Sequence, residues 1–462
     1  MALNEEQIRK IVEETVRNAE HKMCGRWLCD DANEAVESAK AAQRELIGMT
    51  LQERENLITA MRNAALANKV MLAEMAHDET KYGNVAHKIL KNELAAVKTP
   101  GIEDLHTQAY SGDDGLTIVE QAPFGVIGSI TPSTNPTATI INNAISMVAA
   151  GNAVVFNPHP AAKGASQETM RILNDAIANA GGPGTLLTTV KEPTLESGKV
   201  IMNHKDIKIL SITGGEAVVS VAMKTGKKVV AAGPGNPPVI VDDTAALEKA
   251  AIDIVDGASF DNNVLCVAEK EVFAFTNIAD DLMSYMEKNG AFRVYGDDID
   301  KIVRTVLVQK DEKYVINRKF VGRDATYIMQ QSGVAFTGNP RLIIAEVCAS
   351  HPFVIVEMLM PVLGVVRVRD IDEAIDEAFR AEHGCQHSAL IHSTNIRNMS
   401  KAASIMNTTI FVKNAPSYSG LGFGGEGYAT LTIATPTGEG LTSAKTFTRA
   451  RRCVLKGDLR II

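Results

Sequence analysis

The chain has 462 residues, more than one hydrophobic core usually accommodates, so we expect two or three domains. Hydrophobic residues make up 45% and charged residues 22% of the chain, and the formal net charge of -8 excludes nucleic acid and anionic membranes as expected partners. Six scattered cysteines without a C-x-x-C spacing, the absence of a signal peptide and the lack of a bilayer-length apolar run predict a reduced, cytoplasmic protein.

The first 20 residues have the pattern of a separate amphipathic helix. Ile8, Ile11, Val12 and Val16 recur at helical spacing in an otherwise charged segment, and an irregular stretch then separates them from the rest of the chain. Such a helix either covers part of the protein's own surface or binds another protein.

Ala-rich amphipathic helices are predicted from about residue 31 to 98, and a polar, Gly-rich connector leads into a strand insertion near 105–122. Beyond it, short β-branched runs alternate with helices that end in glycine, which is typical of a parallel, doubly wound sheet. We therefore expect an α/β fold whose first Rossmann-like domain covers 30–240.

A second alternating block starts near Thr244 and predicts another doubly wound, Rossmann-like domain over 241–432. The tail, 433–462, is strand-like but has no helix after it. A terminal strand without a crossover helix often completes a neighbouring molecule's sheet. We therefore expect a small β oligomerisation element and a homo-oligomer, either a dimer or a tetramer.

Ligands of a doubly wound sheet bind at the carboxyl ends of its strands, so the turns there are the candidate binding segments. In "ITGGEAVV", Thr213, Gly214 and Gly215 follow a strand and open a helix whose N-terminus favours a phosphate, although a plain turn would use the same residues. "GLGFGG", 420–425, matches G-x-G-x-x-G, but no helix follows it, and we interpret it as a loop.

Two further turns combine proline with small or amide residues. In "SITPSTNP", prolines on both sides hold Asn135 at a strand end, where its amide could donate to a developing oxyanion; an Asx turn or a helix cap is the alternative. "AAGPGNPP", 231–238, is small and stiff enough to lie against a flat ring, and a tight connection between domains is the alternative.

Cys266 stands between an Asn-rich turn and a predicted buried strand in "FDNNVLCVAEKEVF". Buried cysteines are most often small core residues, so a nucleophilic role depends on the turns around it. His383, His387 and His392 are close in sequence but lack a metal-ligand spacing, and we predict no metal site. The G-x-S-x-G motif of serine hydrolases is absent.

Taken in order, these motifs resemble the aldehyde dehydrogenase superfamily from about residue 30 onward. The similarity is greatest to the CoA-acylating aldehyde dehydrogenases of propanediol- and ethanolamine-utilising microcompartments. It rests on "TPSTNP", "NPHPAAKG", "TGGEAVV", "AGPGNPPVIVD", "SFDNN" before Cys266, "TIFVKNAPSYSGLG", "GGEGY" and "PTGEGLTSAKTF". The resemblance implies an aldehyde dehydrogenase-like fold, with NAD bound by 30–240 and catalysis in 241–432.

The resemblance also implies roles for individual residues. Cys266 would be the catalytic nucleophile, Asn135 and the Cys266 backbone N–H would hold the oxyanion, and Glu357 would hold the nicotinamide ribose. The other implied cofactor contacts lie on four turns: Thr131, Pro132 and Ser133; Asn157, Pro158 and His159 at the adenosine ribose; Thr213, Gly214 and Gly215 at the pyrophosphate; Gly233, Pro234 and Gly235 at the nicotinamide.

One position departs from the hydrolytic members of the superfamily. They carry a glutamate general base on the turn that here reads "AAGPG", and the matching residue is Ala232. Without a base, water with a pKa of ~15.7 is hard to activate, whereas a thiol with a pKa of ~8.5 is already partly ionised near neutrality. Ala232 therefore favours an acyl-enzyme that is opened by a thiol.

We predict oxidation of a short-chain aldehyde, propionaldehyde or acetaldehyde, with NAD and coenzyme A, giving acyl-CoA and NADH through a Cys266 thioester. NAD is preferred to NADP because neither Asn157 nor His159 is a Lys or Arg that could meet a 2′-phosphate. The alternatives are a hydrolytic aldehyde dehydrogenase, a redox-silent CoA acyltransferase and a non-catalytic scaffold. His387 could assist deprotonation of coenzyme A or simply pack at a strand end. The resemblance further implies that 1–20 directs the enzyme into a bacterial microcompartment by binding a shell protein.

Overall fold

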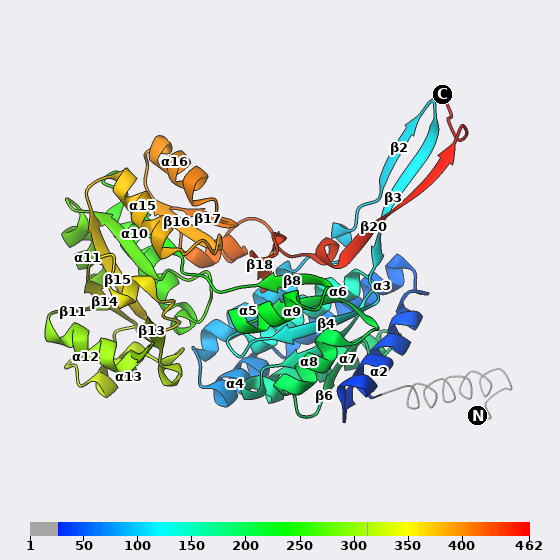
Figure 1. The fold of residues 1–462 in the computed structure, drawn as a ribbon, viewed down its shortest axis with the longest axis horizontal. Helices are drawn as coiled ribbons and strands as arrows, with labels where there is room; N and C mark the ends of the chain where they lie inside the picture. Colours follow the sequence, from blue (N-terminus) through cyan, green and yellow to red (C-terminus); the bar gives the residue numbers. More distant parts are fainter. Residues whose placement is uncertain (1–25, 312) are drawn as a thin grey trace, which may run out of the picture.

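The computed structural model describes residues 26–311 and 313–462. The helix predicted over 1–20 therefore lies outside the described residues. Figure 1 shows two α/β lobes side by side, with a narrow β arm that projects from the first lobe and carries the C-terminus.

The first lobe is built on a six-stranded parallel sheet with the order β1-β6-β5-β4-β7-β8. Its strands are β1 (Leu28–Cys29), β4 (Val126–Thr131), β5 (Ala153–Pro158), β6 (Leu187–Val190), β7 (Ile207–Thr213) and β8 (Lys228–Ala232). Its helices are α2 (Ala32–Leu46), α3 (Leu51–Ala67), α4 (Lys69–Thr80), α5 (Val85–Lys98), α6 (Pro136–Ala149), α7 (Lys163–Asn179), α8 (Leu195–Asn203) and α9 (Glu216–Met223). Every residue of β5 and of α6 is buried, as expected for a sheet covered on both faces.

The second lobe is built on a seven-stranded parallel sheet with the order β11-β14-β15-β10-β9-β16-β17. Its strands are β9 (Pro238–Val241), β10 (Glu271–Phe275), β11 (Ala291–Val294), β14 (Leu342–Glu346), β15 (Val362–Val368), β16 (Ser388–His392) and β17 (Ile410–Lys413). Its helices are α10 (Leu247–Ser259), α11 (Ala279–Lys288), α12 (Asp297–Val306), α13 (Ala325–Ser332), α14 (Pro352–Ile355), α15 (Ile371–Ala381) and α16 (Ile396–Met406). An antiparallel hairpin joins β12 (Leu307–Lys310) to β13 (Lys313–Ile316).

The prediction of an α/β fold with two doubly wound sheets is confirmed. The chain passes from the first sheet to the second at residues 233–237, so β9 already belongs to the second lobe. It returns near β18 (Ile433–Ala434) and β19 (Gly440–Leu441), where Ala434, Ala444 and Phe447 join the core of the first lobe. The cleft between the lobes is therefore lined by segments far apart in the sequence.

The arm is a three-stranded antiparallel sheet of β2 (Gln108–Gly112), β3 (Gly115–Pro123) and β20 (Thr448–Lys456). The strand insertion predicted near 105–122 corresponds to β2 and β3. The strand β20 pairs with β3 of the same chain, and the expectation that the terminal strand completes a neighbouring molecule's sheet stays a prediction. All of β2 and most of β20 are nevertheless exposed.

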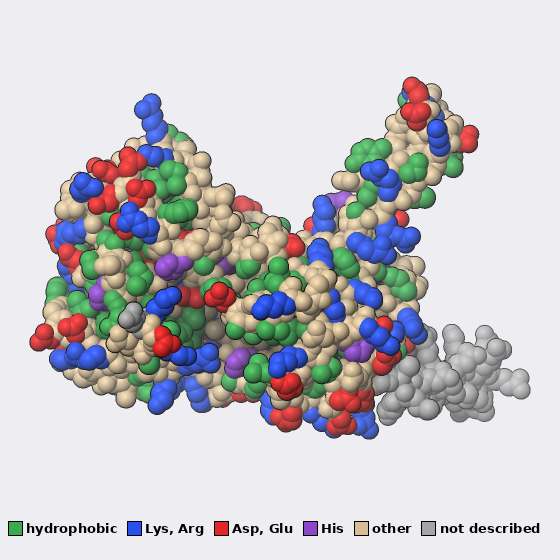
Figure 2. All heavy atoms as spheres, in the orientation of Figure 1, with side chains coloured by type: hydrophobic (Ala, Val, Ile, Leu, Met, Phe, Trp, Pro, Cys, Tyr) green, Lys and Arg blue, Asp and Glu red, His purple; other side chains and the backbone are tan. Residues whose placement is uncertain are grey.

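Charged side chains of both signs are interspersed over the face drawn in Figure 2. No helix within the described part of the chain is both long and apolar enough to cross a membrane.

Candidate active site

Cys266 lies on the loop between α10 and β10, at the edge of the second lobe that faces the first. The loop begins with three consecutive residues in the left-handed backbone region, Asp261 (φ 48°), Asn262 (φ 53°) and Asn263 (φ 64°). Asp and Asn tolerate this conformation better than other non-glycine residues. The left-handed backbone conformation of this loop therefore explains the run "DNN" before Cys266.

Two of these side chains also hold the loop in place through hydrogen bonds. Asn262 Nδ2 donates to the carbonyl oxygen of Gly322 at 3.0 Å and to Asp324 Oδ1 at 2.8 Å. Asn263 Nδ2 donates to the carbonyl oxygens of Ala258 (2.8 Å) and Glu269 (2.9 Å). These hydrogen bonds anchor the loop at Asn262 and Asn263, so the surrounding fold fixes the position of Cys266.

The buried Lys270 also binds this loop. Its Nζ binds Asn263 Oδ1 and donates to the carbonyl oxygens of Asn263 at 3.1 Å and Leu265 at 3.2 Å. Burial, and next the Glu357 carboxylate, raise the pKa of Cys266 to about 12, although Lys270 and two backbone N–H groups of the loop favour the thiolate. The cysteine is therefore a thiol at neutral pH in this state.

Asn135 follows β4 and stands at the N-terminus of α6. Its side chain makes no capping hydrogen bond, so the helix-cap alternative does not describe it. Asn135 Oδ1 accepts a hydrogen bond of 2.5 Å from Lys91 Nζ on α5, while Nδ2 has only a long contact of 3.4 Å to Thr134 Oγ1. The amide nitrogen thus keeps its capacity to donate to a ligand.

The predicted cofactor turns meet at the carboxyl edge of the first sheet. Thr131, which leads into Pro132 and Ser133, pairs with Pro158, and the backbone N–H of His159 donates to the Thr131 carbonyl at 3.0 Å. Asn157 is tied to α8, because its Oδ1 accepts from Ser197 Oγ at 2.6 Å. The buried Asn157 side chain is thus part of the scaffold of this edge.

The turn before α9 has room for a ligand. A Cβ atom built on Gly214 or Gly215 would meet nothing within 4 Å, and Gly215 is exposed at the start of the helix. An open backbone turn at a helix N-terminus is a suitable place for a pyrophosphate. Together with Thr213, whose strand pairs with β8 at Ala232, this turn fits a dinucleotide.

The turn Gly233–Gly235 lies directly against the cysteine loop. A Cβ atom on Gly235 would lie 3.0 Å from the carbonyl oxygen of Cys266 and 2.8 Å from Cγ of His387. The Gly235 N–H also donates to the Glu357 carboxylate, whose pKa is raised by burial against the opposing charge of Lys270. The structure therefore brings Cys266, Gly235, Glu357 and His387 together.

His387 is fully buried beside this turn. Its Nδ1 lies 2.9 Å from Ser388 Oγ, and its Nε2 has no hydrogen-bond partner among the described residues. Burial, and next the charge of Lys270, lower the pKa of His387 to about 4. The ring is therefore neutral at physiological pH and able to accept a proton.

An apolar recess lies on the other side of the nucleophile. Its free volume is only about 10 Å³, so the surrounding side chains nearly fill it. Its lining residues are Leu90, Lys91, Leu94, Phe260, Leu265, Tyr418, Leu421, Phe423 and Leu431. The Phe260 ring lies 5.1 Å from the Tyr418 ring and 5.9 Å from the Phe423 ring, centroid to centroid. These mostly apolar side chains pack around Leu265, the residue before Cys266.

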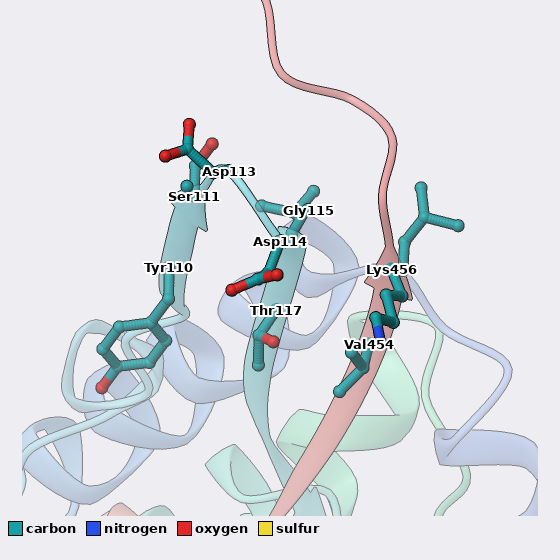
Figure 3. Close-up of a pocket in the computed structure, with 11 residues that line it drawn as sticks. Tyr110, Ser111, Asp113, Asp114, Gly115, Thr117, Val454 and Lys456 are labelled. Atoms are coloured by element: carbon teal, nitrogen blue, oxygen red, sulfur yellow. The ribbon is translucent and has the colours of Figure 1, made fainter.

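A second hollow lies at the tip of the arm, far from this cleft. Asp113 and Asp114 at the β2–β3 turn and Lys456 on β20 are among the residues that line it (Figure 3). Its lining contains neither Cys266 nor any of the cofactor-turn residues. The cleft at Cys266 is therefore the candidate active site.

Sequence reasoning found Cys266, Asn135 and the turns, but it missed Lys88, Lys91 and Lys270. All three lysines are less than 5% exposed. A signal existed for the first two, because they stand three residues apart on the face of α5 that also contains the buried Leu94 and Ala95. A lysine at a buried helical position needs a partner.

Comparison with known proteins identifies relatives along nearly the whole chain. Residues 19–435 match the family model described as the aldehyde dehydrogenase family. The acetaldehyde dehydrogenase (acetylating) EutE of Salmonella typhimurium is 49% identical, with 93% of this chain and 92% of the relative covered. The propanal dehydrogenase (CoA-propanoylating) of Citrobacter freundii is 45% identical, with 98% of both chains covered.

Solved structures show the same similarity. A propionaldehyde dehydrogenase from the Clostridium phytofermentans fucose utilisation bacterial microcompartment superposes with a TM-score of 0.92 at 48% identity, covering 94% of this chain and 100% of the other. The propionaldehyde dehydrogenase of Rhodopseudomonas palustris, solved with bound CoA and an acylated cysteine, gives a TM-score of 0.92 at 47% identity, covering 94% and 99%.

Proposed function

The chain belongs to the aldehyde dehydrogenase family and is a CoA-acylating dehydrogenase of the acetaldehyde and propanal class, and we propose that Cys266 carries its acyl group while Asn135 holds the oxyanion. The observation that carries this assignment is the cleft itself. The Gly233–Gly235 turn lies against the Cys266 loop there, and Ala232 offers a methyl group in place of the water-activating carboxylate.

In the first step the Cys266 thiol gives up its proton to solvent, and its sulfur forms a bond to the aldehyde carbon. The carbonyl π electrons move to oxygen, and the resulting oxyanion accepts hydrogen bonds from Asn135 Nδ2 and the backbone N–H of Cys266. Gly233–Gly235 and Glu357 would hold a nicotinamide cofactor, which would supply the hydride acceptor needed to convert this adduct into a thioester on Cys266.

The second half-reaction transfers the acyl group to a thiol. The thiolate sulfur of coenzyme A adds to the thioester carbon, and the Cys266 thiolate leaves as the acyl-CoA forms. We propose that His387 assists by accepting the thiol proton on Nε2, which has no hydrogen-bond partner among the described residues. The same oxyanion donors serve both tetrahedral intermediates.

The side chain of Ala232 explains why the proposed thioester is opened by a thiol and not by water. It ends β8, is only 6% exposed and presents nothing that could deprotonate water. Without that base the thioester survives until a better nucleophile arrives. The alternatives of a hydrolytic dehydrogenase and of a redox-silent acyltransferase both lack support from this arrangement.

The nucleotide turns support NAD as the oxidant. Asn157 and His159 offer no guanidinium or ammonium group to a 2′-phosphate, so NAD is proposed over NADP. Thr213–Gly215 and Gly233–Gly235 supply backbone for the pyrophosphate and the nicotinamide, Thr131–Ser133 borders the same edge of the sheet, and Glu357 would hold the nicotinamide ribose.

The partners outside the cleft are also proposals. The exposed strands of the arm, β2 and β20, support homo-oligomer formation. The similarity to a dehydrogenase from a bacterial microcompartment supports location in such a compartment, with residues 1–20 as the segment that binds a shell protein.

The test is to follow NADH formation from NAD and propionaldehyde with and without coenzyme A and to identify the acyl product. We expect sustained turnover and propionyl-CoA only with coenzyme A, and at most one equivalent of NADH per active site without it. Equal turnover without coenzyme A, with propionate as product, would contradict the role assigned to Ala232. Acyl exchange without any NADH would favour the acyltransferase.

A further inference from the structure

We propose that Lys91 is a positioning residue for the oxyanion amide: it fixes the Asn135 side chain so that its nitrogen, and not its oxygen, is available to the reacting carbonyl. This inference rests on the proposed role of Asn135. It concerns a residue of α5 that does not itself bind the oxyanion.

Three ionisable side chains meet in the protein interior beside the active site. Lys91 is 4% exposed, Lys88 is 3% exposed and Asp261 is completely buried. Both lysines form ion pairs with Asp261 Oδ2, that of Lys88 at 3.1 Å, and the backbone N–H of Asn84 donates to Asp261 Oδ1 at 2.7 Å. The group therefore carries two positive charges and one negative charge.

Lys91 differs from Lys88 in one contact. Its Nζ also donates to Asn135 Oδ1 at 2.5 Å. Lys91 thereby joins the loop of the nucleophile, through Asp261, to the residue proposed to hold the oxyanion. Lys88 joins only α5 to the loop.

The chemistry of an ammonium group determines which end of the amide it can face. An ammonium has three donors and no acceptor, so it binds the amide oxygen and repels the amide N–H2 group. Rotation of the Asn135 amide by half a turn would replace a charge-assisted hydrogen bond with a donor facing a donor. With Lys91 in place, Nδ2 stays available to the oxyanion.

The charge balance indicates that Lys91 is not required merely to neutralise Asp261. If Lys91 were absent, Lys88 and Asp261 would still form a balanced buried pair. A second buried ammonium is unfavourable, and burial lowers the pKa of Lys91 to about 8 despite the attraction of Asp261. An additional cation retained at this cost is explained by its contact with Asn135.

The test is a double-mutant cycle between Lys91 and Asn135 in the full-length enzyme, with single-turnover NADH formation as the measure of the acylation step. We expect Lys91→Met to slow this step at least about tenfold, since an oxyanion donor contributes ~10²–10³ in rate. The KM values for propionaldehyde and NAD should change little. The variant Lys91→Met/Asn135→Ala should be no slower than Asn135→Ala alone.

Lys88→Met is the matched control, because it removes an equally buried lysine from the same helix and the same aspartate but leaves the contact with Asn135. It should slow acylation less than Lys91→Met. If Lys91→Met does not fold, Lys91→Gln serves instead. A glutamine offers both a donor and an acceptor, so it keeps a hydrogen bond to Asn135 in either orientation and no longer selects one.

Two results would overturn the inference. One is a double variant whose rate falls by the product of the two single effects, since Lys91 would then act independently of Asn135. The other is equal loss in Lys88→Met and Lys91→Met, which would mean that the buried charges act only on folding. A normal acylation rate in Asn135→Ala would instead contradict the proposed function.

Discussion

The cysteine loop and the cofactor turns face each other across the cleft, and they are held in place by different means. The loop around Cys266 is surrounded by buried ionic and amide groups, from Lys88 and Lys91 on one side to Lys270 on the other. The turns at Gly214 and Gly235 consist of small residues. The backbone at Gly214 is open, whereas at Gly235 it packs closely against His387 and the carbonyl of Cys266.

This difference corresponds to what each side has to do. The nucleophile and the oxyanion donor need one fixed geometry, and buried charged hydrogen bonds give a single arrangement because any other leaves an unpaired charge. In the proposed reaction the cofactor side receives two different ligands in succession, the nicotinamide dinucleotide and coenzyme A. Turns made of glycine and other small residues leave room for either ligand.

The largest expected effect comes from removing the nucleophile. Cys266→Ser should lower acyl-CoA formation by at least about 10³-fold, because a hydroxyl is a far weaker nucleophile than a thiolate. NAD should still bind, as measured by nucleotide fluorescence quenching, because the cofactor turns are untouched. Near-normal acylating activity in this variant would exclude Cys266 as the acyl carrier.

Two glycine substitutions test the contrast between the two sides directly. A Cβ atom at Gly83 (φ +70°) would lie 2.0 Å from Asp261 Oδ1, whereas one at Gly214 would meet nothing within 4 Å. Gly83→Ala should lower both Tm and kcat, the latter by up to about 10²-fold, since small displacements of reacting groups are costly. Gly214→Ala should keep Tm and raise KM for NAD and for coenzyme A. Equal effects of the two variants would refute the contrast.

Ala232→Glu places a carboxylate on the cofactor side at the position that lacks a base. We expect steady propionate formation without coenzyme A, at a rate below that of the normal acyl transfer, because a positioned general base contributes ~10²–10⁴ in rate. Product analysis by chromatography provides the measurement, with Ala232→Gln as the uncharged control. Propionate from the glutamine variant as well would show that the carboxylate is not responsible.

The smallest effect concerns stability on the nucleophile side. Burial raises the pKa of Glu269 to about 7, although the backbone N–H (2.8 Å) and Oγ (2.6 Å) of Ser417 bind the carboxylate. The folded state therefore holds a proton that the unfolded chain releases above about pH 4.5. Stability should fall as the pH rises from about 4.5 to 7, by at most about 3 kcal/mol.

Glu269→Gln removes this titration and retains both contacts with Ser417. Its unfolding free energy should match that of the parent near pH 4 and exceed it at pH 8, as measured by urea denaturation. Burial also raises the pKa of the neighbouring Glu271, so part of the slope should persist in the variant. Identical pH profiles for both proteins would mean that Glu269 is not protonated in the folded state.

Much of the fold and the site could be predicted from local patterns. β-branched runs between glycine-ended helices predicted the two sheets, and the resemblance of the turns predicted which side chains meet at Cys266 and Asn135. What could not be predicted was the pairing of β20 with β3 of its own chain. A strand's pattern gives its faces but not its partner.

The sequence by itself determined the two doubly wound sheets, because each strand and helix depends on a short stretch of neighbouring residues. Through the resemblance of its turns it also supplied Cys266 as the proposed nucleophile and Ala232 as the proposed site of the missing base. Only the tertiary structure decided how Lys91 meets Asn135, 44 residues away, and Asp261, 170 residues away. No local pattern specifies such contacts. They form because the packing of α5 against the cysteine loop buries these charges, and a buried charge is stable only where a partner is within reach.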